Sequence, residues 1–153
     1  MIKITLSRWI NCVLILALMV CSIIGFIYDF RIYEYKGTAT AIDAYINFAS
    51  ITIGFLATVI SMLFVLVKQD FMKEVLAKKE SKQDFIMLGS ISILTGFISI
   101  ILAVILTFII ANGNVVGTFS KSISIILIDV IIIYIVNVVL FLLVNLISIF
   151  VDV

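Results

Sequence analysis

Residues 46–67, INFASITIGFLATVISMLFVLV, form an apolar run without a single charged side chain. A helix needs about 20 consecutive apolar residues to cross a bilayer, so this run predicts a membrane-spanning helix. Small or weakly polar residues repeat along it at steps of three and four, which places them on one helix face. These residues are Asn47, Ser50, Gly54, Ala57 and Ser61.

A second apolar run, residues 85–110, carries a similar stripe of small residues. Its members are Gly89, Ser92, Gly96, Ser99 and Ala103. In lipid no hydrophobic force drives helices together, so close approach of small side chains and hydroxyl hydrogen bonds hold them instead. We therefore predict that the two stripes pack against each other in a tight antiparallel hairpin.

The composition belongs to a membrane protein. Of the 153 residues, 65% are hydrophobic and only 12% are charged, whereas about a quarter of the residues in a soluble protein are charged. Two further apolar runs bring the number of predicted spans to four. The sequence therefore predicts an all-α membrane protein of one domain, an antiparallel bundle of four transmembrane helices at about 9–28, 44–80, 82–111 and 121–151.

The first apolar run follows Lys3 and Arg8, as the core of a signal peptide would. Because the run extends over about 20 residues and contains no Ala-x-Ala cleavage pattern, we interpret it as a retained helix.

Positive residues collect on the cytoplasmic side of short membrane loops. Seven of them lie before residue 9 or between residues 68 and 82, against three in the two other loops. We therefore predict that both termini are cytoplasmic. The high content of Ile, Asn and Lys is compatible with a bacterial plasma membrane as the location.

The predicted inner loop is rich in lysine, with Lys68, Lys73, Lys78, Lys79 and Lys82. Apolar residues recur there with helical spacing, which predicts that the second helix extends into the cytoplasm. Four interleaved acids leave the loop nearly neutral, which favours contact with acidic lipid over nucleic acid. We expect no sequence-specific nucleic-acid binding, and keep a cytosolic regulatory partner or a nucleotide signal as an alternative.

Local signals place the helix starts and the outer loop. Asp43 is a predicted N-cap of the second helix, and Ser81 with Asp84 forms a predicted capping box for the third. Residues 29–37 alternate aromatic or apolar with charged side chains, which predicts an extended stretch that ends at Gly37.

The last helix carries a polar face within a run of Ile, Val and Leu. Its main members are Asp129, Tyr134, Asn137 and Asn145. A carboxylate in the hydrocarbon costs about 2.5–3.5 kcal/mol and usually marks an ion path, a proton site or a buried partner. We assign the four residues to a pore or ion path. The alternative, a structural hydrogen bond that joins Asp129 to a hydroxyl of the second or third helix or to Asn137, stays open.

Catalytic patterns are missing from the sequence. It contains no histidine, no Ser/His/Asp set, no metal-ligand spacing and no phosphate-binding glycine loop. The two cysteines lie nine residues apart in the first helix, too far along the axis to form a disulfide. We therefore expect no enzyme, no cofactor and no metal site.

Residues 49–61, ASITIGFLATVIS, set in a compact four-helix chain with a basic inner loop, resemble the small four-helix membrane effectors of prokaryotic anti-phage, abortive-infection systems. The resemblance implies membrane disruption by pores under the control of a cytosolic sensor or nucleotide signal. Our hypothesis is a homo-oligomer in the lipid bilayer that forms an ion-conducting or depolarising pore. A small proton-coupled transporter dimer and a partner-binding immunity or sensor subunit are the alternatives.

Overall fold

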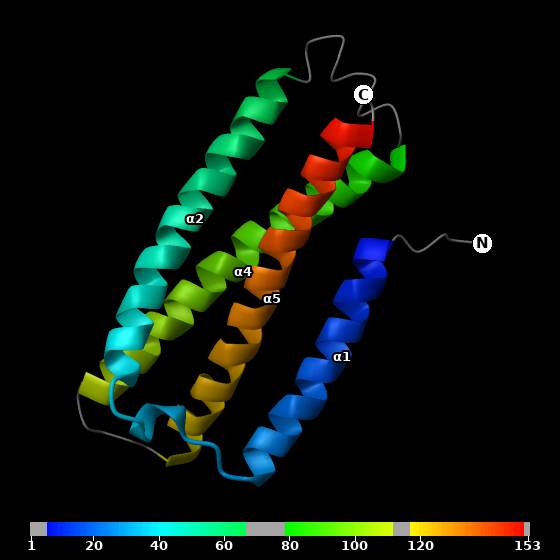
Figure 1. The fold of residues 1–153 in the computed structure, drawn as a ribbon. Coiled ribbons are helices and arrows are strands. Elements are labelled where there is room, and N and C mark those ends of the chain that lie inside the picture. Colours follow the sequence, from blue (N-terminus) through cyan, green and yellow to red (C-terminus); the bar gives the residue numbers. More distant parts are fainter. Residues whose placement is uncertain (1–5, 67–78, 112–116, 152–153) are drawn as a thin grey trace.

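A computed structural model of the chain describes residues 6–66, 79–111 and 117–151. The elements in these ranges are helices: α1 (Leu6–Ile27), the short 3-10 helix η1 (Ile32–Glu34), α2 (Thr38–Leu66), α4 (Lys79–Ala111) and α5 (Gly117–Val151) (Figure 1). The four long helices are each apolar and long enough to cross a membrane. The predicted all-helical class with four such segments is confirmed.

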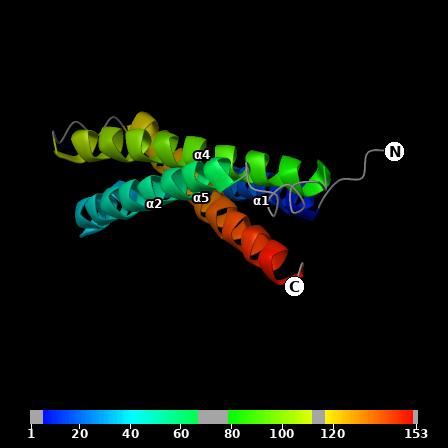
Figure 2. The same ribbon diagram turned by 90° about the horizontal axis from the view of Figure 1, so that it is seen from above.

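The four long helices alternate in direction along the chain. The start of α1, the end of α2, the start of α4 and the end of α5 lie toward one end of the molecule, and η1 lies at the other (Figure 1). Seen from above, the last turns of α5 diverge from α2 and α4 (Figure 2).

Three clusters of buried side chains hold α2, α4 and α5 together. The cluster nearest η1 contains Tyr33, Ile42, Ala103, Leu106, Ile123 and Leu127. The middle cluster contains Ala49, Ile53 and Tyr134, and the third contains Leu56, Leu88 and Phe141. Helix α1 contributes to none of the three clusters and packs mainly on α5. The molecule is therefore a three-helix core with α1 attached to one of its helices.

The small residues of α4 are all buried, as a packing stripe should be: Gly89, Ser92, Gly96, Ser99 and Ala103. A Cβ built on Gly96 would lie 2.8 Å from Ile53 Cδ1 and 2.8 Å from Tyr134 Cε2. The hydroxyl of Ser99 lies 2.5 Å from that of Tyr45. The notches of the α4 stripe therefore receive large side chains from both α2 and α5.

The small residues of α2 behave differently, because all five of them are exposed: Asn47, Ser50, Gly54, Ala57 and Ser61. Helix α2 turns the face with Ala49, Ile53 and Leu56 toward the core instead. The prediction that the two stripes meet within one chain is therefore wrong. A large side chain fills a glycine notch with more contacts than another small residue would make.

The predicted helix starts also need correction. Helix α2 begins at Thr38, directly after Gly37 with its positive φ of 89°, so Asp43 lies inside the helix and is not its N-cap. Helix α4 already includes Lys79, so the Ser81 capping box does not mark its start.

The stretch predicted to be extended contains η1. The backbone of this stretch forms a hydrogen bond within one turn, in which the amide of Tyr35 donates to the carbonyl oxygen of Ile32 at 3.2 Å. The stretch is therefore not fully extended.

The predicted cytoplasmic extension of α2 and the lysines Lys68, Lys73 and Lys78 lie outside the residues that the structure describes. Lys79 and Lys82 belong to α4.

Candidate functional site

Polar side chains meet along the contact between α1 and α5, which run antiparallel. Three pairs join the two helices or their ends: Lys121 with Asp29, Asp129 with Ser22, and Asn137 with Asn11. We call these three pairs the polar seam. All three follow one antiparallel register, so the seam runs along most of the shared length of the two helices.

Asp129 lies half-buried in the middle of the seam. Its carboxylate accepts a hydrogen bond from the hydroxyl of Ser22. The hydroxyl partner of Asp129 therefore comes from α1, and not from the second or third helix or from Asn137. Within one subunit this carboxylate is therefore turned toward a neighbouring helix.

Asn137 is fully buried and exchanges two hydrogen bonds with Asn11. Its side-chain amide donates to the Asn11 oxygen at 2.9 Å and accepts from the Asn11 amide at 3.0 Å. The Asn137 amide also donates to the carbonyl oxygen of Ile133 at 2.8 Å. This exchange satisfies both side chains in an environment that offers no water.

The two remaining residues of the predicted pore face are placed as follows. Tyr134 is fully buried among Ala49 and Ile53, and its hydroxyl makes a long hydrogen bond of 3.5 Å to the carbonyl oxygen of Ala49. Asn145 belongs to α5, and its side chain lies outside the described part of the structure.

Sequence reasoning missed Ser22 and Asn11 as members of the site. Both are isolated polar residues in the apolar run of α1, and eleven residues separate them, which is close to three helical turns. This spacing puts them on one face and was a usable signal for a polar contact along α1.

The end of the seam near η1 is a clasp built on Lys121, a buried lysine. Its ammonium donates to the carbonyl oxygen of Phe26 at 2.6 Å and to Asp29 Oδ1 at 2.7 Å. It also lies 4.4 Å from the centre of the Phe26 ring, within cation–π range. Lys121 thus caps the last turn of α1 and ties it to the start of α5.

The clasp continues into the loop before α2. Arg31 bridges Asp29 at 2.6 Å and Glu34 at 3.0 Å. We call Lys121, Asp29, Arg31 and Glu34 the charge network. Asp29 has a left-handed backbone conformation with φ 56°, which aspartate tolerates better than most residues do. The hydrogen bonds from Lys121, and next those from Arg31, hold the pKa of the Asp29 carboxyl below its ordinary value.

Replacing Asp29 with asparagine is expected to reduce the loss of stability in acid. Because its pKa is lowered in the fold, the Asp29 carboxylate stabilises the protein fully above the ordinary pKa of 3.8 and loses this effect as the pH falls through the lowered value. The thermal unfolding midpoint in detergent micelles, measured at neutral pH and well below pH 3.8, should therefore fall less for Asp29→Asn.

Glu34→Gln is the matched control for this experiment, because it removes an exposed carboxylate of the same network but leaves the Lys121–Asp29 pair in place. Its acid-induced fall should stay close to that of the wild type. An equal fall in the wild type and in Asp29→Asn would contradict the role of the clasp.

A second polar feature lies on the exposed face of α2. Seven exposed residues follow one another along it at alternating steps of three and four. They are Thr40, Asp43, Asn47, Ser50, Gly54, Ala57 and Ser61, and we call them the α2 stripe. Among the described residues, neither Asp43 nor Asn47 has a hydrogen bond or ion pair. The α2 stripe is therefore a continuous exposed row of small and polar residues, and its Asp43 and Asn47 side chains meet no hydrogen-bonding partner within the described part of the subunit.

Comparisons of the chain with protein-family models, with curated proteins and with solved structures found no match in any of the three. Within the described ranges, no group of three His, Cys, Asp or Glu side chains is placed to hold a metal ion.

Proposed function

We propose that the chain assembles into a homo-oligomeric channel, in which α2 from each copy lines an ion-conducting pore. The observation that carries this proposal is the α2 stripe. It runs along most of the helix and is exposed throughout. It also lies on the least hydrophobic of the four candidate spans.

The polar side chains of α2 favour assembly of several copies over exposure of this face to lipid. Asp43 and Asn47 lie within the candidate span Thr38–Met62, and polar groups there must be satisfied because the hydrocarbon offers no hydrogen bonds. The other two asparagines with described side chains, Asn11 and Asn137, satisfy each other inside the subunit. Water in a lumen, together with neighbouring copies, would satisfy Asp43 and Asn47 in the same way.

The pore is assigned to α2 rather than to the polar face of α5. Asp129 and Asn137 bond with α1, and Tyr134 is buried against α2. A pore lined by α5 would require α1 to leave and the polar seam to break. A pore lined by α2 requires no rearrangement of the subunit.

Small side chains suit a helix that packs around a narrow lumen. Nothing lies within 4 Å of a Cβ built on Gly54, so neighbouring copies have room to approach. The hydroxyls of Ser50 and Ser61 each donate to a carbonyl oxygen of their own helix at 2.7 Å, and their lone pairs stay available to water. Such a surface tolerates both close packing and wetting.

A pore of this kind would depolarise the cell that contains it. Residues 49–61, which resemble the membrane effectors of abortive infection, belong to α2. Within this proposal, the segment that carries the resemblance is therefore also the segment that lines the pore.

The test is single-channel recording in planar bilayers. Wild-type protein should conduct, and Ser50→Leu should abolish the conductance because a ring of leucines narrows and dewets the lumen. Ser90→Leu is the matched control, since Ser90 is an exposed serine on α4 and lies outside the α2 stripe. This variant should conduct like the wild type.

Asp129→Asn separates the two possible pore helices. It keeps an acceptor for Ser22 and removes only the charge, so a pore lined by α2 should keep its conductance and ion preference. A changed ion preference would instead assign the pore to α5, and a wild-type protein that reconstitutes without conducting would contradict a channel.

A further inference from the structure

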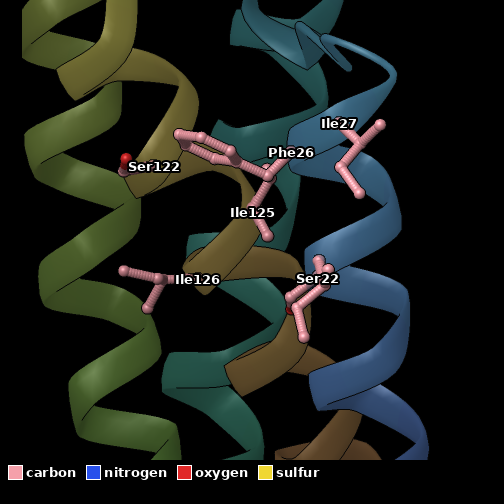
Figure 3. A pocket seen from close by; sticks show the side chains of 7 residues that line it. Ser22, Phe26, Ile27, Ser122, Ile125 and Ile126 are labelled. Atoms are coloured by element: carbon pink, nitrogen blue, oxygen red, sulfur yellow. The ribbon is translucent and has the colours of Figure 1, made fainter.

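A groove of about 330 Å³ opens between α1 and α5 near the end of the molecule that holds η1. Its walls are almost entirely apolar and include Phe26 and Ile27 from α1 with Ser122, Ile125 and Ile126 from α5 (Figure 3). Figure 3 shows the Phe26 ring reaching from α1 across α5 toward Ser122. Ile125 is buried, whereas Ile126 is exposed beside it.

The groove lies where a lipid molecule of the bilayer can enter it. All of its lining residues belong to two candidate membrane spans, Ser7–Ile27 and Gly117–Val144. The groove reaches the last residue of one span and the first turns of the other, so it begins at the level of the lipid headgroups and continues into the hydrocarbon. A hydrocarbon chain that enters from the headgroup level fits this orientation.

The charge network adjoins the groove at Phe26, and its charges balance. Lys121 lies over the ring of Phe26, which lines the groove, and the charge network continues outward from Lys121. The network contains two cations and two carboxylates, joined by contacts of 2.6–3.0 Å. Asp29, Arg31 and Glu34 keep roughly half of their side-chain surface exposed, at 52%, 42% and 56%.

A balanced charge network selects a headgroup with both signs of charge. A phosphate alone would meet Arg31 but would also face the carboxylates of Asp29 and Glu34. A phosphoethanolamine headgroup supplies a phosphate for Arg31 and an ammonium for the carboxylates, so each charge would meet its opposite. A zwitterionic headgroup is therefore the better electrostatic match. Among zwitterionic headgroups, phosphoethanolamine fits better than phosphocholine, because its ammonium has N–H donors for the carboxylates and a trimethylammonium has none.

We propose that this groove binds one phosphatidylethanolamine molecule per subunit, with an acyl chain against Ile125 and Ile126 and the headgroup over the charge network. The site does not depend on the proposed channel, because it lies on α1 and α5 and not on the α2 stripe.

Native mass spectrometry of the full-length protein tests the proposal. The detergent-purified protein is titrated with dioleoyl phosphatidylethanolamine, and separately with the phosphatidylglycerol and phosphatidylcholine of the same chains. The wild type should bind one phosphatidylethanolamine per subunit. Its preference over the other two lipids should be about threefold, as expected for exposed ion pairs.

Two variants separate the groove from the charge network. Ile126→Phe should weaken phosphatidylethanolamine binding about tenfold by filling the groove, whereas Ile135→Phe, at an exposed position of α5 away from it, should not. Removing both outer charges with Arg31→Gln and Glu34→Gln should abolish the headgroup preference and leave chain binding. Equal binding of all three lipids by the wild type, or unchanged binding by Ile126→Phe, would overturn the proposal.

Discussion

Replacing Gly96 with alanine is expected to lower the free energy of unfolding by about 1–3 kcal/mol, the usual cost of overpacking a filled core. A Cβ at this position would lie 2.8 Å from Ile53 Cδ1 and 2.8 Å from Tyr134 Cε2. The terminal methyl group of Ile53 can rotate away. The ring of Tyr134 is fully buried in a cluster with Ala49 and Ile53, so we expect the clash to be relieved by a shift of α4 relative to α5.

Gly54→Ala is the matched control for this prediction, because nothing lies within 4 Å of a Cβ at Gly54. Alanine favours the helix by about 1 kcal/mol over glycine, so the monomer of this variant should be as stable as the wild type or more stable. Reversible unfolding in mixed SDS micelles compares the two. Equal stability of Gly96→Ala and Gly54→Ala would show that α4 does not pack as described.

Gly96 is tightly packed and Gly54 is open, although both belong to similar stripes in the sequence. This difference shows which part of the fold could be predicted. The four spans follow from local hydrophobicity and length, and the sequence is sufficient for both. The inward face of α2 is a different problem, because both of its faces carry a helical repeat of small or apolar residues. In lipid an outward apolar face costs nothing, so hydrophobicity could not decide between the faces. The fit of Ile53 against Gly96 decides it, and this fit depends on three helices at once.

For the polar residues too, the sequence identifies the unusual positions but not the side chains that they contact. Asp129 and Asn137 were recognisable as unusual because each interrupts an apolar run. Their partners Ser22 and Asn11 come from a helix more than 100 positions away in the sequence, and a spacing rule within α5 could not identify them. Lys121 served only as an orientation signal in the sequence, and its role at the end of α1 became visible through Phe26 and Asp29.

Asn137→Leu is expected to lower the free energy of unfolding by about 1–3 kcal/mol. The Asn11 side-chain oxygen would lose its donor in the polar seam, and the Asn11 amide would keep only its bond to the Ser7 carbonyl oxygen. The double variant with Asn11→Leu removes both amides and should lose less than the sum of the two single variants. The difference, the coupling energy, should be about 0.6–1.7 kcal/mol for a hydrogen-bonded pair between membrane helices.

Asn47→Leu serves as the control for that cycle and links it to the proposed channel. Asn47 is exposed and has no hydrogen bond within the described part of the subunit, so leucine there should leave the unfolding of the monomer unchanged. If Asn47 instead faces other copies and water, the same variant should weaken oligomers in crosslinking experiments, whereas Asn137→Leu should act on the monomer first. Strict additivity of Asn11→Leu and Asn137→Leu would show that the amide pair does not form. A destabilised Asn47→Leu monomer would place this asparagine in the subunit core and remove it from the pore.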